Sequence, residues 1–271
     1  MTWAPRPAWL FCPADRPDRY VKALDRSDVV VLDLEDAVAA AAKQAARDAV
    51  AALVRDGRYD ADRTVLRINA AGSPDHAADL LLLERTGILR VMLAKTEQPE
   101  DFDRLRDRAV IALIESPLGV EQCSEISRAP AVIGLMWGAD DLIAGLGGTA
   151  SRRADGTYRD APRYARSRVL IAAKSRNLLA IDAVYMGFSD LDGLRAECED
   201  AVAVGFDATI AIHPSQVDII RDTYAPAADR VDWATRLLAA AGNERGVTTF
   251  EGRMVDGPIY AQAEQILRRA R

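Results

Sequence analysis

Polar and charged side chains follow six short apolar runs of this sequence, and several of them are carboxylates. The six groups are Asp33-Leu34-Glu35-Asp36, Arg67-Ile68-Asn69, Lys95 with Glu97, Glu115, Gly138-Ala139-Asp140-Asp141 and His213-Pro214. Any one of them is typical of a surface loop or a rim ion pair. If the fold brings all six to one edge, several carboxylates share a small space with the cations Arg67 and Lys95. Such carboxylates need a cation or a metal ion nearby, because like charges raise each other's pKa.

Two of these carboxylates, Glu115 and Asp141, suit a hard divalent cation. They follow neighbouring apolar runs, so both can reach one ion. Mg²⁺ is typically held by one or two carboxylates, with water and substrate oxygens completing its shell. Two acidic residues are a weak signal by spacing alone, and Glu115 equally suits the cap of a helix that begins near Pro117.

The two cations offer different chemistry. Arg67 can bind a carboxylate through two hydrogen bonds or stabilise an oxyanion, or it can form a rim ion pair with Glu35 or Asp36. For Lys95 we expect neutralisation of Asp33 or Glu35, and the alternative is a Schiff base with the substrate.

Other polar residues could contact a ligand. His76 lies in a polar loop where we expect solvent exposure, and His213 suits a structural role as well as a catalytic one. Arg16 and Lys22 follow the first apolar run and could grip phosphate oxygens or simply face solvent. The glycine-rich segment 145–148 is not a Walker motif, since no Gly-Lys-Ser/Thr follows it.

The elements that must position these residues are short apolar runs alternating with amphipathic stretches. Eight runs have the length of buried parallel strands: Trp9–Pro13, Val29–Leu34, Val65–Ile68, Val91–Leu93, Val110–Ile114, Val132–Trp137, Ile181–Met186 and Ala208–Ile212. The stretches between them predict helices: Arg19–Leu24, Lys43–Val54, Asp75–Glu84, Pro99–Arg106, Gly119–Ser127, Arg163–Ser175 and Gly193–Val204.

Strands that alternate with helices predict a parallel sheet, and eight such units favour an α/β fold of the (β/α)8 TIM-barrel type. No GxGxxG follows the first run, which counts against a dinucleotide-binding fold. A barrel carries its active site at the C-terminal ends of its strands, so all six polar groups belong to one mouth.

The last part of the chain is additional to a barrel. We divide the sequence into a barrel over residues 1–223 and a C-terminal helical extension over residues 224–271. Helices are expected at Ser215–Tyr224, Ala227–Ala241 and about Pro258–Arg269. The extension could cover the barrel mouth or reach a neighbouring subunit.

Composition limits the classes of function. The 271 residues carry 35 basic and 41 acidic side chains, a net charge of −6, which argues against a general nucleic-acid binder. No apolar stretch reaches the roughly 20 residues of a membrane span, and no signal peptide is evident. Cys12, Cys123 and Cys198 are widely spaced and indicate free thiols in a reducing compartment. We therefore expect a cytoplasmic protein that binds neither nucleic acid nor membranes.

Eight stretches, in this order, resemble the citrate lyase β-subunit-like family within the wider HpcH/HpaI aldolase and citrate lyase superfamily. They are "LFCPADRPDRYVKA", "VVLDLEDAV", "LRINA", "LAKTE", "ALIESPLGV", "MWGADDL", "AIHPSQ" and "FEGRMVDGPIYAQAE", and they span nearly the whole chain. The resemblance implies a (β/α)8 barrel with a C-terminal extension, commonly a homotrimer. It also implies Mg²⁺-dependent cleavage or formation of a carbon–carbon bond in a β-hydroxyacyl thioester.

The resemblance assigns roles to residues of the mouth. It implies that Glu115 and Asp141 hold Mg²⁺ and that Arg67 contacts the carboxylate or thioester oxygen of the substrate. Arg16 and Lys22 match positions that contact coenzyme A phosphates in related malyl-CoA lyases.

Further roles follow for the extension and the surrounding residues. Asp256, in "MVDGP", matches the catalytic aspartate that the extension delivers to a neighbour's active site, although by pattern alone it is a turn residue before Gly257-Pro258. Glu35, Asp36 and Lys95 are expected to surround the metal and set its charge and geometry. Substrate contacts are expected from Gly138, Ala139, His213 and Pro214.

The expected reaction is a retro-Claisen cleavage of a thioester such as malyl-CoA or citramalyl-CoA into an acyl-CoA and an α-keto acid. Mg²⁺ acts as Lewis acid, Arg67 stabilises the thioester enolate and Asp256 protonates it. Four alternatives stay open: a Schiff-base aldolase using Lys95, a metal-dependent pyruvate aldolase on free aldehydes, a citrate lyase subunit that acts on an acyl carrier protein, and a malate-synthase-like enzyme that hydrolyses the thioester. The sequence does not choose the acyl chain or distinguish coenzyme A from an acyl carrier protein.

Overall fold

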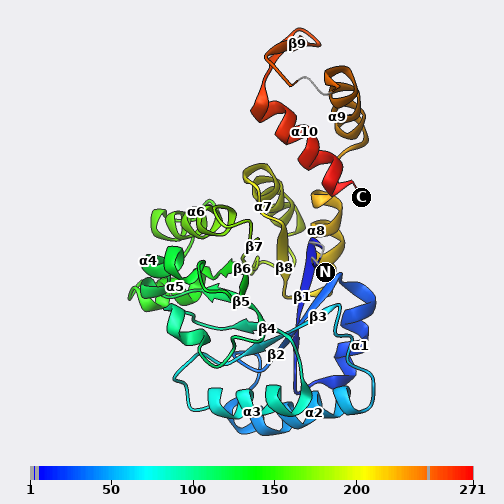
Figure 1. Cartoon of the computed structure of the whole chain (residues 1–271). Helices are drawn as coiled ribbons and strands as arrows, with labels where there is room; N and C mark the ends of the chain where they lie inside the picture. The colour runs from blue at the N-terminus through cyan, green and yellow to red at the C-terminus, as the bar shows by residue number, and fades with distance from the viewer. Residues whose placement is uncertain (1–2, 4–5, 243–244, 271) are drawn as a thin grey trace. The chain divides into compact units, whose positions relative to one another are not determined.

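Eight parallel strands form a closed barrel in which each strand pairs with the next along the chain and the last pairs with the first (Figure 1). The computed structural model describes residues 3, 6–242 and 245–270. The expected (β/α)8 barrel is therefore confirmed. The strands are β1 Ala8–Pro13, β2 Val29–Asp33, β3 Thr64–Ile68, β4 Arg90–Leu93, β5 Ala109–Ile114, β6 Val132–Trp137, β7 Leu179–Asp182 and β8 Ala208–Ala211.

Helices link the strands, and local sequence explains where several of them begin and end. Ser116 caps α4 by accepting a hydrogen bond from the Gly119 N–H, while Gly87 and Gly205 end α3 and α7 in the left-handed region. The helices of the barrel are α1 Pro17–Arg26, α2 Lys43–Arg55, α3 His76–Thr86, α4 Pro117–Ile126, α5 Ala139–Gly145, α6 Asp160–Lys174, α7 Leu191–Val204 and α8 Val217–Tyr224, with 3₁₀ turns η1 Ala40–Ala42, η2 Pro99–Phe102 and η3 Pro214–Gln216.

The inside of the barrel is a packed apolar core. Side chains from all eight strands meet there, among them Trp9, Val31, Val65, Met92, Ile111, Leu113, Met136, Ile181 and Ile210. Because these side chains fill the lower barrel, polar groups and a ligand find room only at its mouth, where the strands end.

Strand register decides which side chains become neighbours at that mouth. β2 and β3 pair so that Asp33 stands opposite Arg67, and Pro13 of β1 stands opposite Asp33. β5 pairs with β6 so that Ile114, next to Glu115, stands opposite Trp137. The register therefore brings residues from distant parts of the sequence to one rim.

Two local expectations were wrong. The seventh strand ends at Asp182 instead of Met186, so the apolar residues that follow belong to a loop of the mouth. Residues 99–106 form only the 3₁₀ turn η2, which buries Phe102 and begins with a capping box of Gln98 and Asp101. The extension also contains an element for which no prediction was made, a short antiparallel hairpin of β9 Thr248–Phe250 with β10 Arg253–Val255.

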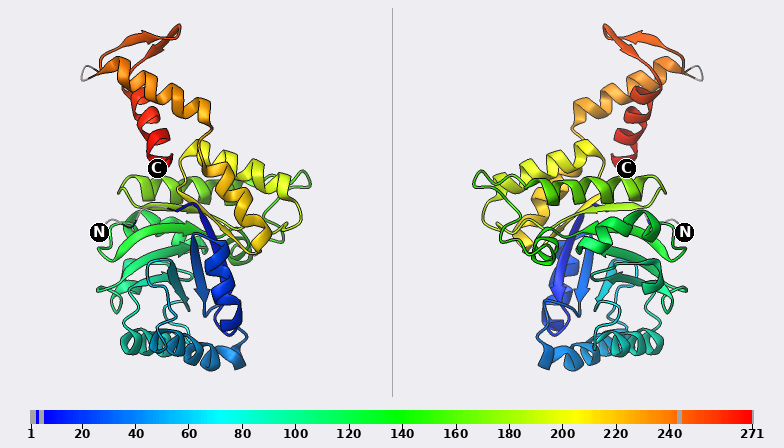
Figure 2. Two further views of the ribbon diagram at one scale, coloured as in Figure 1. Left: turned by 90° about the vertical axis from the view of Figure 1, so that its right-hand side faces the viewer. Right: turned by 90° about the vertical axis from the view of Figure 1, so that its left-hand side faces the viewer.

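The chain divides into two compact units, Met1–Ile220 and Arg221–Arg271, and the division falls within α8. Taken by itself, the second unit consists of α9 Ala228–Ala241 and α10 Gly257–Arg269, which pack side by side, with the β9–β10 hairpin between them in sequence (Figure 2). Its small core contains Ala234, Leu237, Val255, Tyr260 and Ala263.

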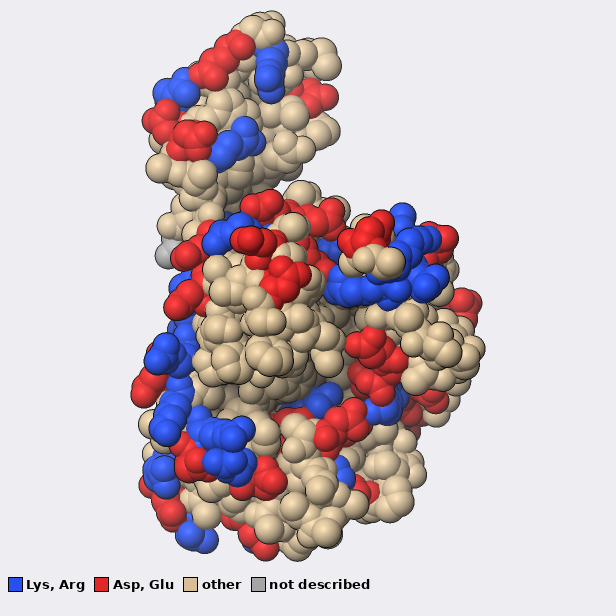
Figure 3. Space-filling view, turned by 180° about the vertical axis from the view of Figure 1, so that it is seen from behind, with Lys and Arg blue, Asp and Glu red and all other residues tan. Residues whose placement is uncertain are grey.

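The three cysteines are all buried free thiols, as the sequence indicated. Among the described residues, no helix combines the length and the apolar character needed to cross a membrane. Basic and acidic side chains are interspersed over the barrel face drawn in Figure 3.

Candidate active site

A cavity of about 1350 Å³ opens at the C-terminal ends of the barrel strands. Its wall takes side chains from seven of the eight strand ends or the loops that follow them, and from helix α1. Of the residues predicted from the sequence, it is lined by Lys22, Asp36, Arg67, Glu115, Gly138, Ala139, Asp141, His213 and Pro214. The structure therefore places these predicted residues around one cavity.

Arg67 is fixed by two carboxylates. Its Nε and Nη2 donate to the two oxygens of Asp33 at 2.7 and 2.6 Å, and its Nη1 lies 3.2 Å from Glu35 Oε2. Its guanidinium also lies over the ring of Phe11, 4.6 Å from the centroid. Burial alone lowers the pKa of Arg67, but Asp33, Glu35 and Glu115 outweigh it and raise the pKa, so the side chain stays charged.

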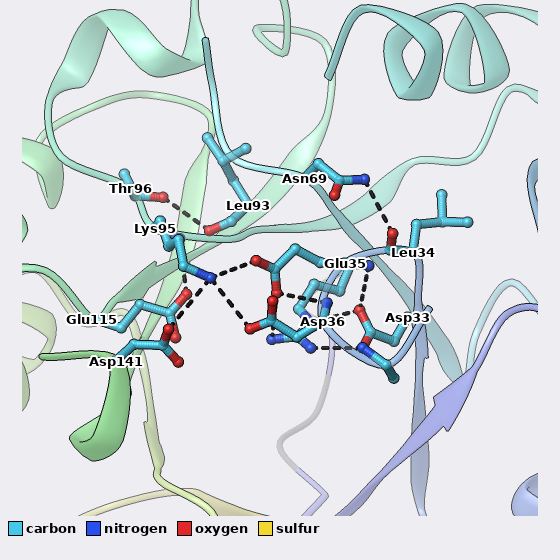
Figure 4. Close-up of polar contacts among 12 residues, drawn as sticks. Asp33, Leu34, Glu35, Asp36, Asn69, Leu93, Lys95, Thr96, Glu115 and Asp141 are labelled. Atoms are coloured by element: carbon cyan, nitrogen blue, oxygen red, sulfur yellow. Dashed lines mark hydrogen bonds and ion pairs between the residues drawn. The ribbon is translucent and has the colours of Figure 1, made fainter. Parts of the chain in front are cut away.

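Lys95 connects the carboxylates of two sides of the mouth (Figure 4). Its Nζ donates to Glu35 Oε1 and lies 3.2 Å from Asp36 Oδ2 and 3.5 Å from Asp141 Oδ1. Burial lowers the pKa of Lys95, yet Glu35, Glu115 and Asp141 raise it above its ordinary value. The ammonium is therefore held in its charged form, and it neutralises Glu35 and Asp36, with Asp33 left to Arg67.

The backbone of Lys95 is strained. Its φ of 48° lies in the left-handed region, which costs a non-glycine residue roughly 1–2 kcal/mol. In that conformation its N–H donates to Glu115 Oε1 at 3.0 Å while the side chain turns toward Glu35. One residue thus holds two carboxylates of the site.

Asp141 lies close enough to Glu115 to affect the pKa of that carboxyl. Burial, with the nearby charge of Asp141, raises the pKa of Glu115 to about 8. Glycine at position 138 makes room for the carboxylate, because a Cβ there would stand 2.8 Å from Glu115 Oε2. Ser116 and not Glu115 caps α4, so the carboxylate of Glu115 is available for another role.

These residues fit a divalent cation. The cluster carries five carboxylates, Asp33, Glu35, Asp36, Glu115 and Asp141, against the two cations Arg67 and Lys95, a formal charge of 2 − 5 = −3. The two oxygen donors, Glu115 and Asp141, both line the cavity. No group of three or more ligating side chains occurs among the described residues, so water and substrate oxygens would complete the shell, as Mg²⁺ usually requires.

A buried polar network, which we did not predict from the sequence, lies behind the end of β2. Lys43 Nζ donates to the carbonyls of Leu34 and Glu35 and to Asn69 Oδ1 at 2.8–2.9 Å. Asn69 Nδ2 in turn donates to Leu34 O and to the buried Asp79. Arg47 donates to Asp79 and Asp75. These bonds fix the loop that carries Glu35.

The phosphate-binding prediction changes in detail. Arg16 is exposed, pairs with Asp18 at 2.9 Å and is not part of the cavity wall. Lys22 does line the cavity, together with Arg19 and Arg26, and the spacing of three and four residues puts all three on one face of α1. The sequence analysis had singled out only Arg16 and Lys22, and therefore missed Arg19 and Arg26 on the same face.

The loop between α5 and α6 forms a wall that the sequence did not predict. Arg152 pairs with Glu197 of α7 at 2.7 Å and stacks on Tyr158, whose ring lies 3.8 Å from the guanidinium carbon. Ser151 donates to Asp140 at 2.7 Å. Arg152 and Tyr158 both line the cavity.

The histidines have structural partners. His213 is exposed, and its Nδ1 accepts a hydrogen bond from the Ser215 N–H in the turn after β8. The expected solvation of His76 was wrong in part, since its Nδ1 lies 2.9 Å from the carbonyl of Asn69.

Asp256 belongs to the second unit, where it precedes α10 at the N-cap position and is partly buried.

Comparison with known proteins identifies the family. The model of the family described as HpcH/HpaI aldolase/citrate lyase matches residues 8–214. The chain belongs to the HpcH/HpaI aldolase/citrate lyase family. The resemblance stated from the motifs is therefore confirmed.

Curated relatives of this family cover nearly the whole chain. A citrate lyase subunit beta-like protein of Mycobacterium tuberculosis is 52% identical over 97% of this chain and 95% of its own length. The mitochondrial citramalyl-CoA lyase of Rattus norvegicus is 29% identical over 98% of this chain and 86% of its own.

A solved structure agrees with both. Protein CitE from Mycobacterium tuberculosis, in complex with magnesium, acetoacetate and coenzyme A, has a TM-score of 0.92 and 51% identity and covers 99% of each chain.

Proposed function

We propose that this chain is a Mg²⁺-dependent carbon–carbon lyase that cleaves a β-hydroxyacyl-CoA into an acyl-CoA and an α-keto acid, reversibly. The observation that carries the proposal is the pair of carboxylates Glu115, which is buried, and Asp141, which is partly exposed. Both line one cavity with Arg67 and the basic face of α1. The family's lyases and the magnesium, acetoacetate and coenzyme A bound by the Mycobacterium tuberculosis relative support it.

Glu115 and Asp141 would hold the magnesium ion through carboxylate oxygens. When bound there, the ion supplies Lewis-acid polarisation of the hydroxyl oxygen that becomes the ketone. Lys95 would keep its ion pairs with Glu35 and Asp141 beside the ion, and so hold the Asp141 carboxylate in place.

Arg67 would donate hydrogen bonds to the thioester oxygen. In cleavage the hydroxyl gives its proton to water in the open cavity. The electron pair of the carbon–carbon bond passes to the α-carbon of the thioester, and negative charge develops on the thioester oxygen. A guanidinium that is already oriented stabilises this charge with little reorganisation. The α-carbon then takes up one proton, for which we propose Asp256 of a neighbouring subunit as donor.

The remaining roles concern assembly and binding. We propose that the extension, residues 224–271, packs on a neighbouring subunit in a homotrimer and supplies Asp256 there. Arg19, Lys22 and Arg26 would bind phosphate groups of coenzyme A, in place of the expected Arg16. An acyl carrier protein could present the same phosphopantetheine arm. The buried free thiols favour the reducing conditions of the cytoplasm.

The charged state of Lys95 counts against a Schiff-base aldolase. Such a lysine must lose its proton to act as a nucleophile, whereas the neighbouring carboxylates raise the pKa of Lys95. The ammonium also has three acidic partners within 3.5 Å.

The test is direct. The purified chain is incubated with (S)-citramalyl-CoA and with malyl-CoA, in Mg²⁺ or in EDTA, and the released pyruvate or glyoxylate is measured. Release that needs Mg²⁺ supports the lyase and ranks the two substrates. Release in EDTA contradicts the metal site and favours Lys95, which borohydride trapping would then test. Absence of release with both thioesters contradicts the coenzyme A substrate.

A further inference from the structure

Every hydrogen-bonding position of the Asp33 carboxylate is occupied within the protein. Oδ1 accepts from the Glu35 N–H at 2.8 Å and from Arg67 Nε at 2.7 Å. Oδ2 accepts from the Ala37 N–H at 3.0 Å and from Arg67 Nη2 at 2.6 Å. A carboxylate has about four lone-pair sites. Asp33, whose exposed fraction is 0%, therefore has no site left for substrate, metal or proton transfer.

Arg67 differs from Asp33, because Asp33 and Glu35 hold its guanidinium and some of its N–H groups remain available to a ligand. A guanidinium has five N–H groups; two bind Asp33, and one faces Glu35 Oε2 at 3.2 Å. The ring of Phe11 supports its face. Arg67 lines the cavity. The direction in which its remaining N–H groups point therefore depends on Asp33, which binds Nε and Nη2.

Asp33 also fixes the loop that follows β2. Its oxygens bind the N–H groups of Glu35 and Ala37, so the same carboxylate sets the start of the loop and the angle of Arg67 (Figure 4). Glu35 then reaches both Arg67 and Lys95. A change at Asp33 consequently moves two charged groups relative to one another.

We propose that Asp33 is a positioning residue, which orients the guanidinium of Arg67 toward the thioester oxygen and takes no part in the chemistry itself. The inference rests on the proposed lyase function. It differs from a simple stabilising role because its effect must pass through Arg67.

The barrel contains a matched pair that serves as a control. Asp182 ends β7, is 1% exposed, and accepts Arg166 Nη2 at 2.7 Å and Arg166 Nε at 3.1 and 3.2 Å. It also accepts from the Ala183 N–H at 3.0 Å. Asp182 and Arg166 thus have the same residue types and bidentate contact, the two aspartates are equally buried, and neither Asp182 nor Arg166 lines the cavity. The link of Asp182 to the cavity is indirect, since Trp137, which lines it, donates from its Nε1 to Asp182 Oδ1 at 2.6 Å.

The experiment compares Asp33→Asn, Arg67→Lys, the double variant and Asp182→Asn for kcat and KM with the thioester that the wild-type chain cleaves. Thermal unfolding of each variant is measured alongside. We expect Asp33→Asn to lower kcat roughly 10²-fold, as a misplaced catalytic group does. Once Arg67 is lysine, the Asp33→Asn change should lower kcat no further. Asp182→Asn should lower Tm similarly and leave kcat within about threefold.

Two results would overturn the proposal. One is a kcat for Asp33→Asn that matches that of Asp182→Asn at equal Tm, which would make Asp33 a structural residue. The other is a full additional loss in the double variant, which would mean that Asp33 acts without Arg67.

Two further measurements distinguish a variant that fails to fold from a proposed function that is wrong. If Asp33→Asn does not fold, Asp33→Glu keeps the buried charge, lengthens the side chain by one methylene, and is compared with Asp182→Glu. If the wild-type chain cleaves neither thioester, the proposed function fails, and crystal structures of the folded variants decide about Asp33. A displaced Arg67 guanidinium supports the proposal, and an unchanged one contradicts it.

Discussion

The two sides of the barrel mouth differ in chemistry. The ends of β2 to β6 carry Asp33, Glu35, Asp36, Arg67, Lys95, Glu115 and Asp141, which are joined by ion pairs or held by backbone hydrogen bonds. The ends of β1, β7 and β8 contribute mainly apolar residues to the same cavity, Pro13, Val184, Met186, Ile212 and Pro214, with the polar residues His213, Ser215 and Asp218 beside them after β8. The ends of β2 to β6 therefore hold the charged groups in place, and the ends of β1, β7 and β8 determine the shape of the cavity.

This division has a physical reason. Charged groups near one another fix each other's protonation states, whereas an apolar wall excludes water and strengthens their interactions. We expect substitutions on the charged side to change kcat, and substitutions on the apolar side to change which acyl chain binds. The predictions below test that difference.

The largest effect is expected for Glu115→Gln. The substitution keeps the size of the side chain and removes its charge, so the Mg²⁺-dependent release of keto acid should fall about 10³-fold or more. Because the raised pKa of Glu115 shows that its neutral form is tolerated in place, the variant should fold normally. Calorimetry should detect the accompanying loss of Mg²⁺ binding. Glu121→Gln, an exposed change on α4, is the matched control, and equal Mg²⁺ affinity in both variants would remove Glu115 from the site.

The affinity for Mg²⁺ should depend on pH. Glu115 has a pKa of about 8 without metal, so Mg²⁺ must displace its proton at pH 7. Affinity should rise up to about tenfold per pH unit below pH 8 and level off above it. Calorimetry in buffers of different ionisation enthalpy measures the released proton.

The same shift gives a stability prediction with a definite sign. A carboxylate whose pKa is raised on folding stabilises the protein when protonated. That stability is fully present below the ordinary glutamate value and is lost as pH rises through about 8. Chemical denaturation of the metal-free chain should therefore show falling stability over this range, while Glu115→Gln should lack this contribution.

A smaller effect is expected at the basic face of α1. Lys22→Ala should raise the KM for a coenzyme A thioester roughly tenfold with little change in kcat, because it removes binding that is equal in the ground and transition states. Added salt should reduce the difference in KM between the wild-type chain and Lys22→Ala, because it screens the charge of Lys22. Arg16→Ala is measured beside it: its pairing with Asp18 outside the cavity predicts a weaker effect, and an equal one would restore Arg16 to the binding site.

The smallest effect is expected on the apolar wall. Met186 lines the cavity and is 59% exposed, so Met186→Ala should leave Tm nearly unchanged. Its kcat should stay within about threefold, while the ratio of kcat/KM for citramalyl-CoA and malyl-CoA shifts, since one methylene in a pocket is worth about 10-fold or more. A large loss of kcat with an unchanged ratio would contradict the contrast between the two sides.

Local patterns in the sequence were enough to predict the barrel and the charged cluster. Short β-branched runs have one stable arrangement when eight alternate with helices, and the polar residue that ends each run must then face the mouth. That reasoning placed Arg67, Glu115 and Asp141 in one cavity. It failed for the seventh strand because residues 183–186 are as apolar as a strand but form a loop after β7.

The parts that sequence reasoning missed depend on contacts between distant segments. Lys43 and Asp79 lie on helices, where a charged residue ordinarily indicates a solvated face, and only the fold turns them toward Asn69. Arg152 and Glu197 are 45 residues apart and meet across a loop. Asp33 was recognised as a strand end, but its partner depended on the register of β2 with β3.

The backbone of Lys95 has a consequence for directed evolution. A left-handed conformation favours glycine or asparagine, so replacing Lys95 by either would relieve backbone strain but would also leave Glu35 and Asp36 without their ammonium partner. A screen for thermostability alone therefore measures only the balance of these two effects and does not detect the loss of turnover when the ammonium between Glu35 and Asp141 is gone. Any library built on this barrel should keep that codon fixed, or screen for turnover and stability together.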